Sequence, residues 1–257
     1  MLLKSLVSAF SMYSRIPMPQ IEWKEENRRY SLCFFPLIGA VIGAILLLWS
    51  YISDILGIGD NLFGAVCAAV PIIVTGGIHL DGFCDVCDAK ASYAPKEKAL
   101  EIMSDSHIGA FAAISLGVYL MIDAAFFADA RGNALMPMIA CVFIQSRALS
   151  GLGAVTFKCA KKDGTLQSFS KPAHKMITVA VLSAVLLICF GIMVYSYPVS
   201  GLAGFAGGVL SFLYYRIFSY KRFGGITGDL AGYFLQLCEL FMLICIVVSD
   251  KIVSAFM

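Results

Sequence analysis

Three aspartates stand at helical spacing directly after a long apolar segment. Asp81, Asp85 and Asp88 occupy positions i, i+4 and i+7, so a helix that continues from the preceding apolar run would carry all three on one face. Carboxylates in one row repel each other unless a cation neutralises them or they become protonated. Hard divalent ions such as Mg²⁺ take carboxylate oxygens and bridge them to substrate phosphates. The spacing therefore indicates metal-assisted phosphate chemistry, and Gly82 permits close backbone approach there.

A second pair of acids follows after a turn. Glu101 and Asp105 repeat the i, i+4 spacing on a predicted short helix over residues 96–106, so the two acidic helices would form a hairpin. Lys98 and His107 lie among these acids and are available to phosphate oxygens. A solvated loop whose acids pair with its own lysines would have the same composition.

A third acidic element lies far along the chain, at residues 223–229, which read FGGITGD. Gly225 and Gly228 permit positive φ angles and leave backbone N–H groups free to bind phosphate, and Asp229 is available to a metal. We predict that Thr227 contacts substrate with them. A flexible turn before a helix is the alternative interpretation.

Two charged residues fall inside apolar segments. Arg147 lies in the middle of one and is expected to face protein or a polar cavity with an acidic partner. Glu239 lies inside the last apolar segment, where an ionisable residue is either functional or neutral and hydrogen-bonded. Lys162 begins a basic loop that would grip a nucleotide or anchor the loop to lipid headgroups.

The composition is that of an integral membrane protein. Apolar residues make up 60% of the chain and charged residues only 14%, with a mean hydropathy of +0.84. A membrane-spanning helix takes roughly 20 apolar residues. We predict an all-α, polytopic bundle of about seven such helices, forming a single domain over residues 1–257. The expected spans are 31–53, 61–79, 108–128, 134–157, 176–196, 201–220 and 230–249.

The first thirty residues predict an interfacial segment. Apolar residues recur at helical spacing up to Tyr13, with polar residues interleaved, which is typical of a helix lying in the membrane interface. Pro17 and Pro19 are expected to end it. Ser8 and Ser11 interrupt the apolar run too early for a cleaved signal peptide.

Basic residues predict the orientation, because Lys and Arg accumulate in cytoplasmic loops. With seven spans, the outer side holds only Arg131 and Lys251. We therefore expect an inner-membrane protein with a cytoplasmic N-terminus, and with the acidic loop 80–107 and the active site on the cytoplasmic face. The expected cytoplasmic side holds Lys4, Arg15, Lys24, Arg28, Arg29, Lys90, Lys96, Lys98, Lys158, Lys161, Lys162, Lys171, Lys175, Arg216, Lys221 and Arg222.

The cysteines show no disulfide framework, since most of the nine lie within or beside apolar segments. Cys84 and Cys87 form a C-x-x-C motif with His79 nearby, which raises zinc as an alternative. Structural zinc needs four N or S ligands, and no second Cys/His pair stands in a loop. Packing is the favoured role of both thiols.

The motifs together resemble the cobalamin synthase family, the adenosylcobinamide-GDP ribazoletransferases. The resemblance rests on residues 76–89, which read GGIHLDGFCDVCDA, and on residues 99–111, which read ALEIMSDSHIGAF. Shorter matches follow the family in order: RIP at 15–17, FPLIG at 35–39 and GITGD at 225–229. Residues 162–164 match a family loop more loosely. The departures, chiefly Cys84 and Cys87, leave the acids intact.

The resemblance implies an enzyme that joins α-ribazole, or its 5′-phosphate, to adenosylcobinamide-GDP and releases GMP, with Mg²⁺ as cofactor. We predict that Asp81, Asp85, Glu101 and Asp105 bind one or two Mg²⁺ ions, while Asp88 completes the shell or takes the hydroxyl proton. The lipid bilayer is a further expected partner, and no nucleic-acid partner is expected. An oligomer is compatible with the sequence. The predicted substrate-binding residues are His79, Gly82, Lys98, His107, Arg147, Lys162, Gly225, Thr227, Gly228 and Asp229.

Two other functions share some of these features. A CDP-alcohol phosphotransferase also uses an acidic helix pair for diphosphate chemistry, but its Ala-Arg is absent after Asp81 and Gly82. An ion-coupled transporter would also place Arg147 and Glu239 inside a bundle. Transporters, however, put coupling sites near the bilayer midplane and show repeated halves, whereas most acids here lie at one membrane edge.

Overall fold

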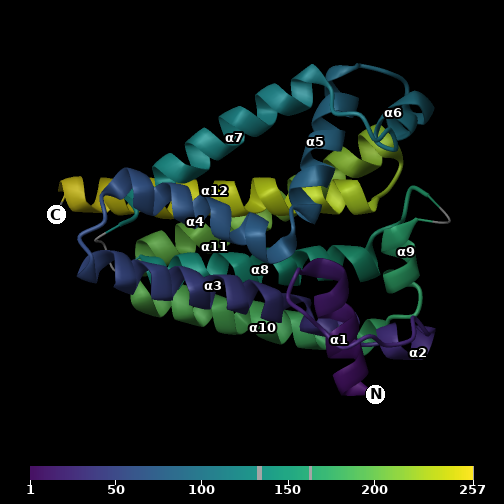
Figure 1. The fold of residues 1–257 in the computed structure, drawn as a ribbon, viewed down its shortest axis with the longest axis horizontal. Coiled ribbons are helices and arrows are strands. Elements are labelled where there is room, and N and C mark those ends of the chain that lie inside the picture. Colours follow the sequence, from purple (N-terminus) through teal and green to yellow (C-terminus); the bar gives the residue numbers. More distant parts are fainter. Residues whose placement is uncertain (132–134, 162–163, 257) are drawn as a thin grey trace.

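The computed structural model describes residues 1–131, 135–161 and 164–256. Within these ranges the chain is helical, and its one β-type contact is an isolated parallel bridge between Cys159 and Ile226. Figure 1 shows a bundle whose long helices follow one axis, with shorter helices gathered at the end where the N-terminus lies. The helices are α1 (Leu2–Tyr13), α2 (Glu25–Arg28), α3 (Ser31–Ile55), α4 (Asp60–Thr75), α5 (Ile78–Ala91), α6 (Lys96–Ile102), α7 (Ala110–Asp129), α8 (Met136–Thr156), α9 (Thr165–Ser170), α10 (Lys175–Ser196), α11 (Pro198–Phe223) and α12 (Gly228–Phe256).

Six of the described helices, α3, α7, α8, α10, α11 and α12, are long and apolar enough to cross a membrane. A seventh span is counted when α4 is taken together with the helix that follows it. This confirms the predicted polytopic all-α fold with about seven spans. The predicted second span, 61–79, is longer than the helix found there, because α4 ends at Thr75.

The sequence pattern predicted that the acidic helix would continue from the preceding span. The structure shows instead that α5 is a separate helix from α4. Gly76 and Gly77 both adopt the left-handed conformation, with φ angles of 67° and 78°, which glycine enters without the steric cost of a side chain. The chain bends by 99° between the two helices. Helix α5 therefore crosses the bundle axis, outside the six spans, toward the end of the bundle that carries α6 (Figure 1).

Helix α8 forms the centre of the bundle. It packs against α3, α10, α11 and α12, and most of its residues are buried. Helix α5 in turn packs against α7 and α12. The acidic helix is therefore held between two spanning helices that are far apart in the sequence.

Helix α1 is the predicted N-terminal helix, and it packs on α3. Phe10 and Ala9 are buried, whereas Leu2 and Leu3 are exposed. The helix ends at Tyr13, before the two prolines. Beyond it, the backbone N–H of Arg15 donates to the carbonyl of Val74 at 2.8 Å, so the segment after α1 is tied to the end of α4.

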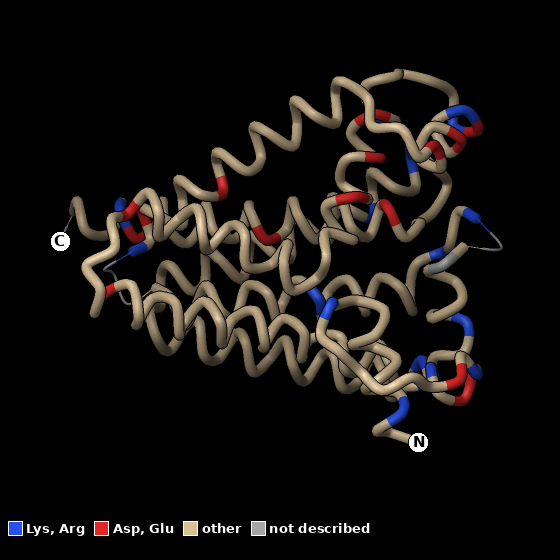
Figure 2. The backbone as a smooth tube through the Cα atoms, viewed as in Figure 1, with Lys and Arg blue, Asp and Glu red and all other residues tan. Residues whose placement is uncertain are grey.

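Charged residues gather at the two ends of the bundle (Figure 2). Arg131 lies at one end, where its guanidinium contacts Asp54 and Asp60 at 3.3 Å and 3.1 Å. At the same end, Lys251 pairs with Asp129 at 3.0 Å. The opposite end carries the N-terminus, α5, α6 and α9, together with most of the basic and acidic residues.

Candidate active site

Two acidic segments that are distant in the sequence meet where α5 lies against the start of α12. A Cβ atom at Gly82 would lie 2.8 Å from both the Cα and the carbonyl oxygen of Asp229. The absence of a side chain at position 82 therefore allows the two backbones to touch. This contact places Asp81, one residue earlier, and Asp229 in the lining of the same cavity.

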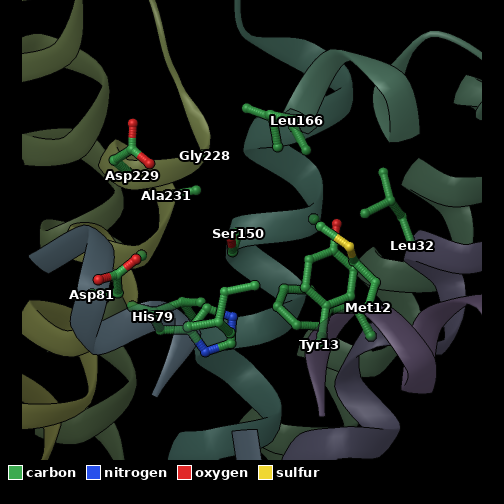
Figure 3. Close-up of a pocket in the computed structure, with 16 residues that line it drawn as sticks. Met12, Tyr13, Leu32, His79, Asp81, Ser150, Leu166, Gly228, Asp229 and Ala231 are labelled. Carbon is green, nitrogen blue, oxygen red and sulfur yellow. The ribbon is translucent and has the colours of Figure 1, made fainter. Parts of the chain in front are cut away.

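The shared cavity has a volume of ≈ 190 Å³ (Figure 3). Asp81 and Asp229 lie on one side of it, with Tyr13 and Met12 of α1 on the other. Apolar residues form most of the remaining wall, and Ser150 of α8 adds a hydroxyl group. The lining consists of Met12, Tyr13, Leu32, Phe35, Ile78, His79, Asp81, Ser150, Gly151, Ala154, Leu166, Gly228, Asp229, Ala231, Gly232 and Leu235.

Asp85, one helical turn after Asp81, is half-buried beside the same acids. Burial raises its pKa to about 7, and the negative charges of Asp81, Asp229 and Asp88 add to the effect. The carboxylates of α5 and α12 are therefore close enough to repel each other. Such a group of hard oxygen donors has the chemistry that divalent cations favour.

Asp88 holds a different position from the other two aspartates of α5. Its carboxylate accepts hydrogen bonds from the backbone N–H groups of Gly109 at 2.6 Å and Ala112 at 2.9 Å. Gly109 is the N-cap residue of α7 and Ala112 lies in its first turn, where the helix leaves its N–H donors unsatisfied. Asp88 thus fixes the start of α7 against α5.

The second predicted acidic helix is shorter than the sequence indicated. Helix α6 ends at Ile102, so Glu101 and Asp105 do not share a helical face. Glu101 is exposed and pairs with Lys98 at 3.0 Å. Asp105 accepts hydrogen bonds from the backbone N–H and the ring of His107, and these bonds lower its pKa.

These observations bear on the predicted metal ligands. Within residues 1–131, 135–161 and 164–256, no group of three or more His, Cys, Asp or Glu side chains is placed to hold a metal ion. Asp81 and Asp85 lie together with Asp229, whereas Glu101 and Asp105 are engaged with their own neighbours on the loop around α6. The role of all four as metal ligands stays a prediction.

The glycine loop before α12 is fixed by backbone contacts. The N–H of Ile226 donates to the carbonyl of Lys158 at 2.8 Å, and the N–H of Ala160 donates back to Ile226 at 2.8 Å. Gly225 has a φ of 157°, and a Cβ there would collide with the carbonyl of Lys158. The hydroxyl of Thr227 accepts the N–H of Leu230 at 3.2 Å and so caps α12.

Two further cavities adjoin the first one and share its acids. One, of ≈ 240 Å³, is lined by Lys161, Gln167, Thr227, Gly228 and Asp229, among others. The other, of ≈ 570 Å³, is more open and is lined by residues that include Arg15, Gly77 and Asp81. Asp81 and Asp229 each line two cavities. Lys162, predicted to bind substrate, lies outside the described residues.

His79 is a buried residue in the wall of the central cavity. Its ring lies beside those of Tyr13 and Phe35, with centroid distances of 6.4 Å and 5.9 Å, and His79 is only 6% exposed. Neither ring nitrogen has a hydrogen-bond partner among the described residues.

Arg147, predicted to bind substrate and to have an acidic partner, has that partner in Glu239. Its guanidinium lies 2.7 Å from the carboxylate, which also accepts a hydrogen bond from Ser146 at 2.7 Å. Both charged side chains are buried, and neither lines the central cavity. The predicted pairing is confirmed.

Sequence reasoning missed the contribution of α1 to the site. Met12 and Tyr13 line the central cavity, although the N-terminal segment was predicted only as an interfacial helix. Ser150 and Leu166 were missed as well. The one signal in the sequence was the RIP motif at 15–17, since Arg15 lines the adjoining cavity.

Fold and site together define a polytopic helical membrane protein with a carboxylate-lined cavity at one end of its bundle. Comparison with known protein families identifies the family to which the chain belongs. The chain belongs to the cobalamin-5-phosphate synthase family, whose model matches residues 5–247.

Curated relatives agree over nearly the whole chain. An adenosylcobinamide-GDP ribazoletransferase of Lachnoclostridium phytofermentans is 43% identical, with 98% of this chain and 96% of the relative covered. Proteins of the same name from Desulfitobacterium hafniense and Clostridium perfringens are 34% and 33% identical, over 94% and 92% of this chain and 96% and 94% of theirs. No solved structure matches the chain.

Proposed function

We propose that this chain joins α-ribazole, or its 5′-phosphate, to adenosylcobinamide-GDP and releases GMP, and that the transfer takes place where α5 meets α12. Family membership supports the reaction. One structural observation supports this location of the reaction: Asp81 and Asp229 line the same cavity, and that cavity adjoins two others. Two large substrates need such adjoining spaces around one reacting centre.

The reaction is the attack of a nucleoside hydroxyl on a phosphorus atom of the diphosphate. A new P–O bond forms, the P–O bond to GMP breaks, and the hydroxyl proton passes to a base. Positioning and charge stabilisation are the main requirements of such a transfer. Asp81 and Asp229, which line the cavity, are suited to accept the proton and to orient the hydroxyl.

A divalent cation fits the donor chemistry of this site. Asp81, Asp85 and Asp229 repel one another electrostatically but are not gathered into a ready-made metal site among the described residues, and we propose that they hold Mg²⁺ when substrate is bound. Glu101 and Asp105 remain candidate ligands on the loop around α6. When bound, the ion would neutralise charge on the diphosphate and on the departing GMP. Lys161, which lines the adjoining ≈ 240 Å³ cavity, is placed to bind phosphate oxygens.

We further propose that the end of the bundle carrying the site faces the cytoplasm of an inner-membrane protein. Most Lys and Arg residues lie at this end (Figure 2). Positive charge beside spanning helices favours the cytoplasmic side.

The test uses purified protein in detergent with adenosylcobinamide-GDP and α-ribazole, with and without Mg²⁺. We expect equal amounts of GMP and adenosylcobalamin, formed only with the metal. A parallel reaction supplies a CDP-linked lipid precursor and an alcohol. Products from that pair alone, by protein shown to be folded, would replace the proposal with a lipid-precursor transferase.

A further inference from the structure

The central cavity has the properties of a binding site for a flat, mostly apolar ring. At ≈ 190 Å³ it is smaller than the roughly 300–1,000 Å³ of sites for drug-sized ligands. Its wall is largely apolar and includes Tyr13 and Phe35, whose rings contact each other at 4.4 Å between centroids. A ring system fits a space of this size and lining, and a corrin macrocycle does not.

His79 supplies polar groups that nothing in the described chain satisfies. Its side chain is more than nine-tenths buried, and both ring nitrogens are without a partner. Figure 3 shows the ring at the cavity, between Asp81 and Tyr13. Buried polar atoms are nearly always hydrogen-bonded in folded proteins. The unpaired imidazole in the cavity wall, whose nitrogens are covered in this structure, therefore indicates a ligand toward which the ring turns on binding. An imidazole carries an N–H donor whichever of its ring nitrogens is protonated.

The two substrates of the proposed reaction contain two different bases. Guanine carries several donors and acceptors, and burying it needs a matched partner for each of them. The central cavity offers few polar side chains besides its two acids, namely those of His79, Ser150 and Tyr13. The base of α-ribazole is a benzimidazole with methyl substituents and one free ring nitrogen. Its needs match an apolar, aromatic cavity with one hydrogen-bond donor.

We infer that the central cavity is the binding site for the benzimidazole base of α-ribazole, with His79 donating a hydrogen bond to the free ring nitrogen. The inference rests on the proposed function. Because Asp81 and Asp229 lie on one side of the cavity, a base seated inside directs its ribose toward these acids. The guanine nucleotide then takes the adjoining cavity lined by Lys161, Gln167 and Thr227.

The first test is kinetic and separates the two substrates. His79→Phe keeps an aromatic ring and removes the donor, and we expect the KM for α-ribazole to rise about tenfold, with the KM for adenosylcobinamide-GDP unchanged. His79→Asn retains a donor and should recover part of the loss. Ala154→Leu, which fills the cavity, should raise the same KM. His174→Phe is the matched control, because His174 is exposed and lies outside the cavity.

The second test observes the imidazole directly. The chain has three histidines, so a ¹⁵N-histidine-labelled sample gives a simple spectrum in which the His79→Asn variant identifies one residue. Saturation with α-ribazole alone should shift the His79 signals and leave those of His174 in place. This binding experiment reads the site without requiring turnover.

The outcomes separate this inference from the proposed function. Wild-type protein that forms no adenosylcobalamin overturns the proposed function. Normal turnover, combined with His79 variants that raise only the KM for adenosylcobinamide-GDP, would assign the cavity to that substrate instead and overturn the inference. His79 signals that respond to GDP but not to α-ribazole would do the same.

Discussion

Arg147 of α8 and Glu239 of α12 form an ion pair of 2.7 Å that is almost completely buried between two spanning helices. Glu239 also accepts the Ser146 hydroxyl, so the carboxylate is bonded from two neighbouring residues of α8. Charges at this depth persist only when they are paired and hydrogen-bonded. The pair therefore ties α12, which carries Asp229 in its first turn, to the central helix of the bundle.

Removing one partner of this pair should destabilise the protein strongly. We expect Glu239→Ala to lower the free energy of unfolding by about 3–5 kcal/mol, because it leaves the guanidinium buried without a counter-charge. The double variant Arg147→Leu/Glu239→Leu should recover much of the loss. Thermal unfolding in detergent measures both.

Lys251→Ala is the control for the buried pair. Lys251 and Asp129 form an ion pair that is about half exposed, and such pairs contribute about 0–1 kcal/mol. Equal losses from Lys251→Ala and Glu239→Ala would contradict the structural role given to Arg147 and Glu239.

Asp88 should act on stability more than on chemistry. Asp88→Ala removes the acceptor of two N–H groups at the start of α7, and we expect a loss of about 1–2 kcal/mol in the free energy of unfolding. Asp88→Asn keeps one acceptor oxygen and should retain measurable turnover. If Asp88→Asn were folded as stably as the wild type yet inactive, Asp88 would belong to the reacting centre after all.

Gly82 should tolerate no side chain. Gly82→Ala places a Cβ 2.8 Å from backbone atoms of Asp229, so α5 and α12 must separate. Overpacking of this kind costs about 1–3 kcal/mol, and the displaced acids should lower kcat at least tenfold. Gly117→Ala in α7 is the control, since no heavy atom lies within 4 Å of a Cβ there. A Gly82→Ala enzyme with unchanged kcat would refute the close packing.

Magnesium should stabilise the protein in the presence of adenosylcobinamide-GDP. A ligand that binds the folded state at 100 times its Kd adds about 2.7 kcal/mol to the free energy of unfolding. We expect Mg²⁺ to raise the Tm of the wild type and to have no effect on Asp81→Asn/Asp85→Asn. Asp250→Asn, at the opposite end of α12, should respond like the wild type. A Mg²⁺ shift that survives in the double variant would place the ion elsewhere.

Much of the fold can be predicted from the sequence, because membrane-spanning helices are recognised as long apolar segments. The ends of α3, α7, α8 and α10 lie within two residues of the predicted bounds. The position of Arg147 inside an apolar segment also predicted that it has an acidic partner. The helix bounds and this pairing were predictable because the first depend on neighbouring residues and the second on the strong penalty for burying an unpaired charge.

The site was less predictable, because it depends on contacts between distant segments. The apolar run before Asp81 favoured a continuous helix, and the two left-handed glycines at 76 and 77 override it. The contact between Tyr13 of α1 and His79 of α5 is a tertiary contact that no spacing encodes, so Met12 and Tyr13 were missed. Helix α6 stops at Ile102, although the i, i+4 spacing of Glu101 and Asp105 had extended it to residue 106.

The central claim is that Asp81 of α5 and Asp229 of α12 form one reacting centre. The most direct measurement compares GMP release from adenosylcobinamide-GDP and α-ribazole by Asp81→Asn, Asp229→Asn and the control Asp250→Asn, each with its Tm. We predict that the first two variants stay folded and lose at least a hundredfold in kcat, while the control keeps wild-type activity. Wild-type kcat in either cavity variant would contradict the claim.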